Sequence, residues 1–377
     1  MVIDQKYLLE VSSLKIGIIR TSSIGDVILG TACLDYLRQV APEAEIIWVG
    51  RSPSLHLVHQ CWPSVVPLEI PSGGSSKKSR EIFQTLKTCD AVIDLQTNFR
   101  SRMMMASLRR AKIPVFVADK APRFRTKLVV FGWLRGRLAR LPASSKIAPT
   151  LQFRMMLDAL HRALVFLKKS DAASLGRSRP NLPNNFLAQI EQSWALEMSF
   201  GNWVAVSPGA SHEPKRAPTE VFADILGALA AQCIGETTIP GLVFLGGAAD
   251  RVAAVTLMDQ LSWPGAVVNL AGKLTLDQTM LALTKVKTLL SNDSGLAHIA
   301  EAVGTPVAVL FGPTSEAFGF SPHLANSQSF SSDTGCRPCS KHGKTPCRYN
   351  DQMCFRSIDT RQIALHMKRL IDDRTRL

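Results

Sequence analysis

Residues 288–314 of the 377-residue chain have the sequence TLLSNDSGLAHIAEAVGTPVAVLFGPT, which contains the pattern that decides the fold. Apolar, β-rich runs at 288–291 and 306–311 flank one short helical period at 295–303, with a polar turn at 292–294. A strand, a helix and a second strand in this order form a βαβ unit with parallel strands. The stretch therefore predicts an α/β fold built on a parallel sheet.

The polar turn of this unit is a candidate binding site. A strand is expected to meet the N-terminus of a helix here, at Asn292, Asp293, Ser294 and Gly295. His298 follows one helical turn later. Free backbone N–H groups and the helix dipole favour an anion or a ribose hydroxyl at such a point. From these residues alone, an equally good interpretation is that Asp293 and Ser294 only cap the helix.

The same alternation of strands and helices runs through both halves of the chain. In the first half, strands are expected at 15–20, 45–49, 91–95 and 115–117, and helices at 27–40, 81–88 and 99–109. In the second, strands at 203–207, 242–245 and 267–270 alternate with helices at 219–231, 249–261 and 274–286. The segment 170–185 is poor in apolar residues and predicts a linker. We expect domains at 1–180 and 181–355 facing across a cleft, and a C-terminal helix within 356–377.

The composition is that of an ordinary globular protein, with 46% hydrophobic and 20% charged residues. No apolar run approaches the roughly 18 residues that span a bilayer. The opening MVIDQKYLLEV lacks the pattern of a signal peptide. We therefore expect a soluble, cytoplasmic protein.

The net charge of +14 is concentrated in residues 100–140, which contain twelve Lys or Arg and a single acid, Asp119. Such a patch is expected to attract a polyanion or an anionic membrane surface. A solvated basic face without a partner is the alternative. Nucleic acid would match the charge, but the chain contains no zinc-finger or RNP signature, so we do not expect it as a partner.

Four of the eight cysteines fall within a short stretch near the C-terminus. Cys336, Cys339, Cys347 and Cys354 have the spacing C-x2-C-x7-C-x6-C. In a reducing compartment this spacing suggests a structural zinc site, although the second pair departs from common zinc motifs. Buried thiols without metal are the alternative.

Two further loops are expected at the same sheet edge as the polar turn. Loop 207–218, SPGASHEPKRAP, brings Lys215 and Arg216 to a rim where cations and a helix N-terminus would suit a diphosphate. Asp250, after Gly246 and Gly247, is a candidate partner for a ribose hydroxyl. The chain has neither a G-x-x-x-x-G-K-[ST] loop nor a G-x-G-x-x-G fingerprint, which argues against P-loop and dehydrogenase classes.

Asp26 is the candidate general base of the first half. It follows the strand at 15–20 and falls at the start of the next helix, where the helix dipole favours the ionised carboxylate. An ordinary helix-initiating acid is the alternative. The chain has no D-x-D pair, so stabilisation of a leaving diphosphate would fall to cations and helix dipoles rather than to a carboxylate-held metal.

Five stretches, taken in order, resemble the ADP-heptose:lipopolysaccharide heptosyltransferases of glycosyltransferase family 9. These are RTSSIGDVILGTACLDYLR, DLQTNFRS, SPGASHEPKRAPTEVFADIL, LSNDSGLAHIAEAVGTPVAVLFGPT and the cysteine-rich stretch. The resemblance implies a GT-B architecture, with two Rossmann-like doubly wound domains and an interdomain active site. It also implies inverting transfer of heptose from ADP-heptose to the inner core of lipopolysaccharide without a catalytic cofactor. A different nucleotide sugar, or nucleotide binding without catalysis, are the alternatives.

The resemblance also implies roles for individual residues. Asp26 matches the catalytic base and Lys215 the lysine that binds the donor diphosphate. Asp293, Ser294, Gly295 and His298 fall on the family's donor-binding block, and Gln96, Asn98 and Arg100 on its acceptor-facing block. From their place in the rim loops, Arg216 and Asp250 are also expected donor contacts, and Ser23 is a further expected acceptor contact. The chain departs from the family at Ala217, where an aromatic residue would be expected after the basic pair; this departure concerns the contacts to the donor sugar and base, not the phosphate contact.

Overall fold

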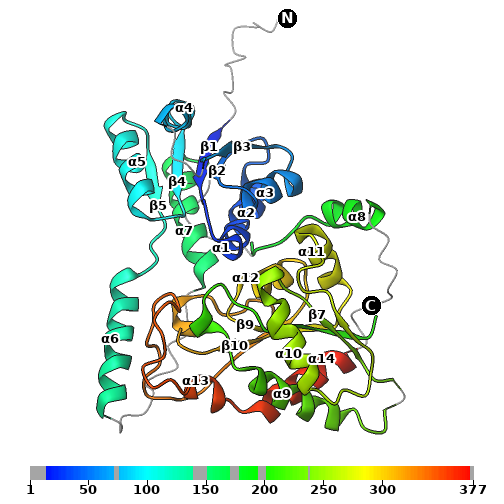
Figure 1. Ribbon diagram of the computed structural model, residues 1–377. Coiled ribbons are helices and arrows are strands. Elements are labelled where there is room, and N and C mark those ends of the chain that lie inside the picture. Colours follow the sequence, from blue (N-terminus) through cyan, green and yellow to red (C-terminus); the bar gives the residue numbers. More distant parts are fainter. Residues whose placement is uncertain are drawn as a thin grey trace, which may run out of the picture. The chain divides into compact units, whose positions relative to one another are not determined.

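The computed structural model describes residues 14–71, 76–138, 151–169, 178–193, 201–236 and 238–373. The chain forms two compact units, which Figure 1 colours along the sequence. Unit 1 comprises Met1–Asp119 and Met155–Arg179, and unit 2 comprises Lys120–Arg154 and Pro180–Leu377. The opening residues 1–13 and the first half of the predicted linker, 170–177, lie outside the described residues.

Unit 1 contains a five-stranded parallel sheet with the order β3-β2-β1-β4-β5. Its strands are β1 (Lys15–Ile19), β2 (Glu45–Gly50), β3 (Val65–Glu69), β4 (Ala91–Asp94) and β5 (Val115–Val117). Its helices are α1 (Ile24–Gly30), α2 (Ala32–Val40), α3 (Ser54–Cys61), α4 (Ser76–Leu86), α5 (Phe99–Arg110) and most of α7 (Gln152–Phe166). Because β1 lies at the centre, the loop that leaves it is surrounded by the loops of its neighbours.

Alternate side chains of these strands enter cores on the two faces of the sheet. Ile47 and Val49 of β2 pack in a cluster with α4 and α5. Trp48, between them in sequence, points to the opposite face, where a Cβ on Gly30 of α1 would lie 3.2 Å from its ring. Helices therefore cover both faces, as expected for parallel strands buried on both sides.

Unit 2 contains a six-stranded sheet with the order β11-β10-β9-β6-β7-β8, again parallel throughout. Its strands are β6 (Trp203–Ser207), β7 (Gly241–Phe244), β8 (Val267–Asn269), β9 (Thr288–Asn292), β10 (Val307–Phe311) and β11 (Gln328–Ser331). Its helices are α6 (Pro122–Leu138), α8 (Asn184–Ser193), α9 (Thr219–Gln232), α10 (Arg251–Gln260), α11 (Leu276–Thr284), α12 (Gly295–Ala302), α13 (Met353–Arg356) and α14 (Thr360–Asp372). The stretch 288–314 thus forms β9-α12-β10, the predicted βαβ unit.

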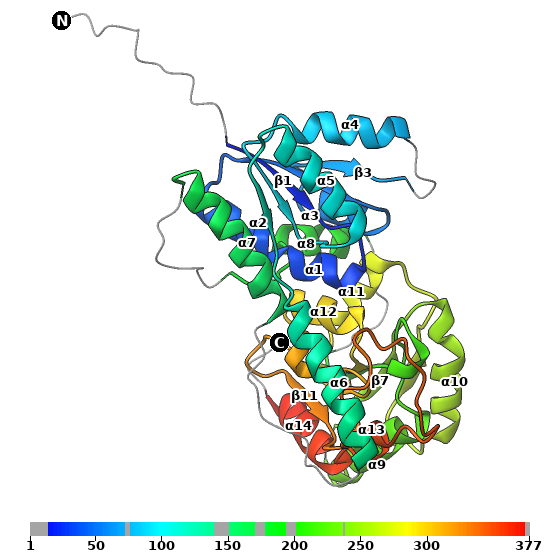
Figure 2. The same cartoon turned by 90° about the vertical axis from the view of Figure 1, so that its left-hand side faces the viewer.

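The C-terminal helix α14 belongs to the core of unit 2. Ile363 and Met367 of α14 are fully buried in one cluster with Phe222 of α9 and Phe355 of α13. Figure 2 shows α14, α13 and α9 together at one end of unit 2. The C-terminal helix predicted within 356–377 is therefore present and is part of this unit.

Helix α6 and the residues around it lie in unit 2, whereas the predicted first domain ran to residue 180. Buried arginines account for this placement. Arg125 donates to the carbonyl oxygen of Phe318 at 2.5 Å and to the side chain of Gln152, and Arg135 donates to the carbonyl oxygen of Arg337 at 2.7 Å. The hypothesis of one solvent-exposed basic surface over 100–140 is thus wrong for Arg125 and Arg135, which bind backbone of their own unit.

No helix among the described ranges is long and apolar enough to cross a bilayer.

Candidate active site

Asp26 lies in the first turn of α1, immediately after the central strand of unit 1. Its carboxylate pairs with the guanidinium of Arg20 at 2.5 Å, and its Oδ2 accepts from the hydroxyl of Ser23 at 3.2 Å. Arg20, at the end of β1, is 2% exposed and also donates to the carbonyl oxygen of Leu95 at 2.6 Å. A buried cation therefore fixes a carboxylate whose side chain remains 23% exposed at the sheet edge.

Ser23 and Asp26 also form the capping box of α1, because Asp26 Oδ2 accepts from the backbone N–H of Ser23 at 3.3 Å. The helix-initiating role weighed for Asp26 is thus present. It does not compete with proton abstraction, since capping and pairing hold the carboxylate in place at an accessible position. Catalysis by Asp26 and acceptor binding by Ser23 stay predictions.

The predicted acceptor residues lie beside the loop that carries Asp26. The side-chain oxygen of Gln96 accepts from the backbone N–H of Thr21 at 2.9 Å and of Ser22 at 3.4 Å. Asn98 caps α5 by accepting from the N–H of Ser101 at 2.9 Å. The segment after β4 is therefore tied to the loop after β1, as expected for neighbouring parallel strands.

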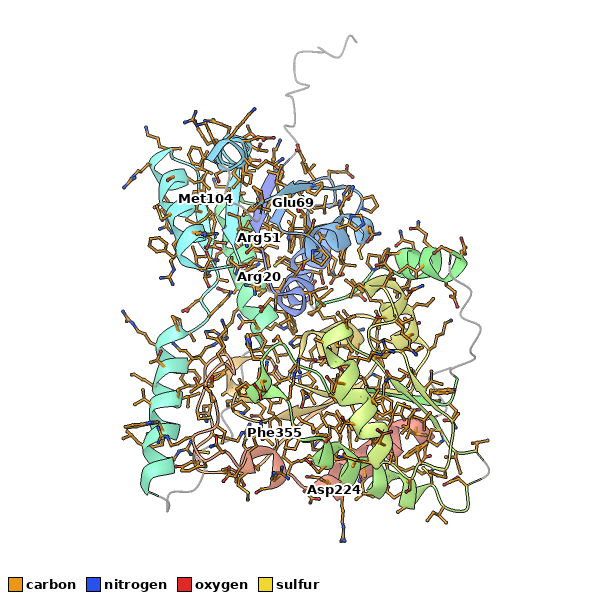
Figure 3. All side chains as sticks on the ribbon, in the orientation of Figure 1. Arg20, Arg51, Glu69, Met104, Asp224 and Phe355 are labelled. Carbon is orange, nitrogen blue, oxygen red and sulfur yellow. The ribbon has the colours of Figure 1, made fainter. Side chains whose placement is uncertain are left out.

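A cavity of about 60 Å³ opens beside these residues. Three predicted acceptor residues line it, together with Arg51 and Met104, and the full lining is Ile19, Thr21, Arg51, Ile70, Gln96, Asn98, Arg100, Ser101 and Met104. Figure 3 labels Arg51, at the end of β2, and Met104 on α5. Sequence reasoning missed Arg51, because a single arginine after a strand carries no recognisable pattern. Two guanidinium groups on one cavity suit a carboxylate or a phosphate.

Asp94, the last residue of β4, binds the residues that follow it in this region. It is fully buried, and its carboxylate accepts from the N–H groups of Gln96 at 2.8 Å and Thr97 at 2.9 Å, and from the hydroxyl of Ser101 at 2.8 Å. Three donors on one buried carboxylate fix the turn between β4 and α5. In the sequence analysis, Asp94 appears only as the first residue of the stretch DLQTNFRS, and no role was predicted for it.

Asp94→Ala is expected to destabilise the protein by about 1–3 kcal/mol, because it leaves one buried and two partly buried donors without their acceptor. The measurement is the urea midpoint of unfolding, with Asp90→Ala as the matched control. Asp90 accepts a backbone bond from Lys15, but in an exposed position. Equal midpoints for the two variants would contradict this account of Asp94.

In unit 2, Lys215 and Asp293 form a nearly buried ion pair of 2.7 Å. Lys215 comes from the loop after β6, and Asp293 from the turn after β9, the adjacent central strand. The hydroxyl of Thr314, after β10, donates to the same oxygen of Asp293 at 2.9 Å. Three loops therefore meet at a single carboxylate, and two of them, the Lys215 loop and the Asp293 turn, were predicted to share one rim.

Asn292 fixes the loop that carries Lys215. Its side-chain N–H donates to the carbonyl oxygen of Pro208 at 2.7 Å, and its side-chain oxygen accepts from the N–H of Ala217 at 3.1 Å. The side-chain amide of Asn292 thus forms hydrogen bonds with both ends of the loop SPGASHEPKRAP. The small residue Ala217 is held through its backbone, and this contact does not depend on its side chain.

Neither Asp293 nor Ser294 caps α12 with its side chain. Asp293 binds Lys215 and Thr314, and the hydroxyl of Ser294 lies 3.0 Å from that of Ser291. The capping interpretation of this turn is therefore wrong. Gly295 begins α12, and the ring of His298, on the same helix, lies 6.0 Å from the ring of Phe320. Asp293, Ser294 and His298 border one shallow recess at this helix N-terminus.

Arg216 and Asp250 form a second, looser pair at 3.5 Å. The carboxylate of Asp250 also accepts from the N–H of Gly247 at 2.9 Å. A Cβ on Gly209 would lie 2.2 Å from this carboxylate, so the glycine is needed for the close approach of the loop after β6. Asp250 thus holds two rim loops together, and its contact with a ribose hydroxyl stays a prediction.

The cysteine-rich segment also reaches the Lys215 region. Gly343 has φ +69°, and a Cβ there would lie 2.1 Å from the Cγ of Lys215. Partial burial and the positive charges of Lys344 and Lys215 lower the pKa of His212. The segment therefore brings a further cation, Lys344, to the neighbourhood of the candidate phosphate site, which the loop sequences did not predict.

The structural zinc hypothesis is not supported. In the part of the chain that the structure describes, which includes all four cysteines, no three His, Cys, Asp or Glu side chains are grouped so that they could hold a metal ion. The thiols have separate partners: Cys339 contacts the carbonyl oxygen of Pro313, and Cys347 the carboxylate of Asp351. Cys354 packs in the core beside Phe355, and burial raises its pKa to about 12.

Similarity to known proteins identifies the family of the chain. Residues 146–349 match the model of glycosyltransferase family 9 (heptosyltransferase). The chain is 24% identical over 299 residues to the lipopolysaccharide core heptosyltransferase OpsX of Haemophilus influenzae, covering 78% of each chain. It is 35% identical over 129 residues to lipopolysaccharide heptosyltransferase 2 of Escherichia coli, covering 33% of this chain and 34% of that one.

Among solved structures, the E. coli ADP-heptose lipopolysaccharide heptosyltransferase II superposes with a TM-score of 0.63 and 22% identity, covering 95% of this chain and 98% of that one. This likeness confirms the predicted GT-B fold class with two Rossmann-like units. The matched family region contains the whole rim of unit 2 from Lys215 to Thr314. The chain is a glycosyltransferase and belongs to glycosyltransferase family 9, the heptosyltransferases.

Proposed function

We propose that the protein transfers a heptose from ADP-heptose to the inner core of lipopolysaccharide, with inversion at the anomeric carbon. The observation that carries the proposal is the pair Lys215–Asp293 at the N-terminus of α12. It places a positive charge, held by a nearly buried carboxylate, where the helix dipole also favours an anion. Such a site suits the diphosphate of a nucleotide sugar.

The reaction is a single displacement. Asp26 accepts the proton of an acceptor hydroxyl, whose oxygen forms the new bond to the anomeric carbon as the bond to the diphosphate breaks. Lys215 and the N–H groups at the start of α12 stabilise the negative charge that develops on the departing ADP. Arg216, Asp250, Ser294 and His298 complete the donor contacts.

The acceptor is an acidic glycolipid, and the cavity of unit 1 supports this assignment. Arg51 and Arg100 both line it, so a carboxylate or phosphate of the core sugars finds two guanidinium partners there. Gln96 and Asn98 lie on the same wall. We place the enzyme in the cytoplasm, at an anionic membrane surface where such an acceptor is embedded.

The test is a matrix of nucleotide sugars against truncated lipopolysaccharide cores, with each product identified by mass. A product that is heavier than the acceptor by one heptose, formed only with ADP-heptose, is the expected result. Transfer of a different sugar would establish a different donor. ADP-sugar binding without transfer to any acceptor would indicate a nucleotide-binding protein without catalysis.

A further inference from the structure

Helix α6 has its charged and apolar residues reversed relative to an ordinary surface helix. Arg125 and Arg135 point inward and are buried in unit 2. Four large apolar side chains of the second half are exposed instead: Val130 (50%), Phe131 (46%), Trp133 (38%) and Leu134 (43%). A helix that serves only the stability of a soluble domain places its apolar face inward and its charges in water.

The inward contacts fix the orientation of the helix. Arg125 and Arg135 bind carbonyl oxygens of residues far along the chain, Phe318 and Arg337. Between them, Gly132 lies so close to the segment after β11 that a Cβ would be 2.5 Å from the carbonyl oxygen of Pro338. The helix therefore cannot roll its apolar side chains inward without breaking these contacts. Figures 1 and 2 both show α6 along the outside of unit 2.

The outward face is also basic along its first half. Arg123 and Lys127 are exposed, and at 3.6 residues per turn they share one side of the helix with Val130 and Leu134. Phe131 and Trp133 flank that side, and Trp133 packs against the guanidinium of Arg348, 5.1 Å from its ring centre. Cations next to aliphatic and aromatic side chains on one helix face are typical of helices that lie in a bilayer interface.

We propose that α6 is a docking helix that inserts Val130, Phe131, Trp133 and Leu134 into an anionic lipid bilayer, with Arg123 and Lys127 on the lipid headgroups. The partner is a membrane surface rather than a protein because the face combines exposed positive charge with aromatic residues, and the chain as a whole carries +14. The proposal deepens the proposed function, since an acceptor embedded in a membrane requires the enzyme at that surface.

The experiment measures co-sedimentation of the full-length protein with vesicles of phosphatidylcholine containing one-third phosphatidylglycerol. The test variant is Val130→Ser/Leu134→Ser. The matched control is Val252→Ser/Val255→Ser, which removes two similarly exposed apolar side chains from α10 of the same unit. Binding is expected to fall about tenfold or more in the test variant and to stay at the wild-type level in the control.

A third variant, Arg123→Gln/Lys127→Gln, separates charge from insertion. Its binding to the anionic vesicles is expected to fall about thirtyfold, since each of the two cations near such a surface contributes about 1 kcal/mol. Its weak binding to pure phosphatidylcholine is expected to stay unchanged. Wild-type binding by both α6 variants, with melting temperatures equal to that of the wild type, would overturn the proposal.

Two further readouts test whether the exposed face of α6 is a dimer interface or a part of the catalytic machinery. Light scattering of the free protein measures the oligomeric state: a wild-type dimer that becomes monomeric in Val130→Ser/Leu134→Ser, without vesicle binding by either, would refute docking. Transfer to a deacylated, water-soluble acceptor is expected to be equal in wild type and test variant, whereas transfer to acceptor in vesicles falls. Vesicle binding is measured without any substrate, so docking and the proposed function can fail independently.

Discussion

Asp26→Asn is expected to lower kcat by about 10²–10⁴-fold while binding of the nucleotide sugar persists. Asparagine keeps the size of the side chain and can still accept from Ser23, but it cannot take a proton from the acceptor hydroxyl. The loss corresponds to roughly 3–5 kcal/mol of barrier. The measurement is kcat at saturating donor and acceptor, together with donor affinity by calorimetry.

The variant also leaves Arg20 beside a neutral amide, so its stability must be followed separately. A lower melting temperature is expected, because Arg20 is buried and loses its charged partner. Assays therefore run well below the transition. Asp35→Asn is the matched control: Asp35 lies in the first turn of the next helix, α2, and accepts from the nearby Gln39 side chain at 3.0 Å. Near-normal kcat in folded Asp26→Asn would refute Asp26 as the base.

Lys215→Met is expected to lower kcat/KM for the donor by about 10²–10³-fold, a typical cost of removing one preorganised group that stabilises developing charge. Methionine keeps much of the hydrocarbon stem but removes the ammonium group that pairs with Asp293. ADP affinity is expected to fall as well, in contrast to Asp26→Asn, because the lysine contacts the leaving group in both the ground state and the transition state.

The control for this variant is Lys285→Met. Lys285 also forms an ion pair in unit 2, with Glu191, but both side chains are exposed, and Lys285 precedes β9, at the end of the strand opposite to the rim. Surface pairs of this kind contribute about 0–1 kcal/mol. Activity at the wild-type level in Lys285→Met, with the loss confined to Lys215→Met, is the expected pattern. Equal effects of the two variants on donor kinetics would remove the phosphate role of Lys215.

Strongly apolar strands were the part of the fold that the sequence predicted best. The strands at 115–117 and 203–207 match β5 and β6 residue for residue. Two edge strands escaped prediction for physical reasons: β3 contains Pro67, which an edge tolerates, and β11 is the short polar run QSFS. The single helix expected at 27–40 is divided at Thr31, whose hydroxyl bonds back to the carbonyl oxygen of Ile28 at 2.7 Å.

Sheet topology explains which site residues could be found from the sequence. Lys215 and Asp293 follow strands that are adjacent in the sheet, so the shared carboxyl edge brought them together as predicted. Arg20 and Arg51 were missed because nothing in the sequence distinguishes an inward-turning arginine from a solvated one. The inward arginines of α6 were missed for the same reason, and the charge of residues 100–140 was therefore attributed to one surface.

The contact between Gly343 and Lys215 means that the cysteine-rich segment restricts the conformation of the Lys215 side chain. The glycine backbone at φ +69° fills the space against the lysine stem, and no other residue type fits there without moving that stem. The orientation of Lys215, the cation that we assign to the donor diphosphate, thus depends partly on a stretch that is distant in the chain. Grafting the loop SPGASHEPKRAP alone into another scaffold would carry over the lysine but not the glycine contact that orients its side chain.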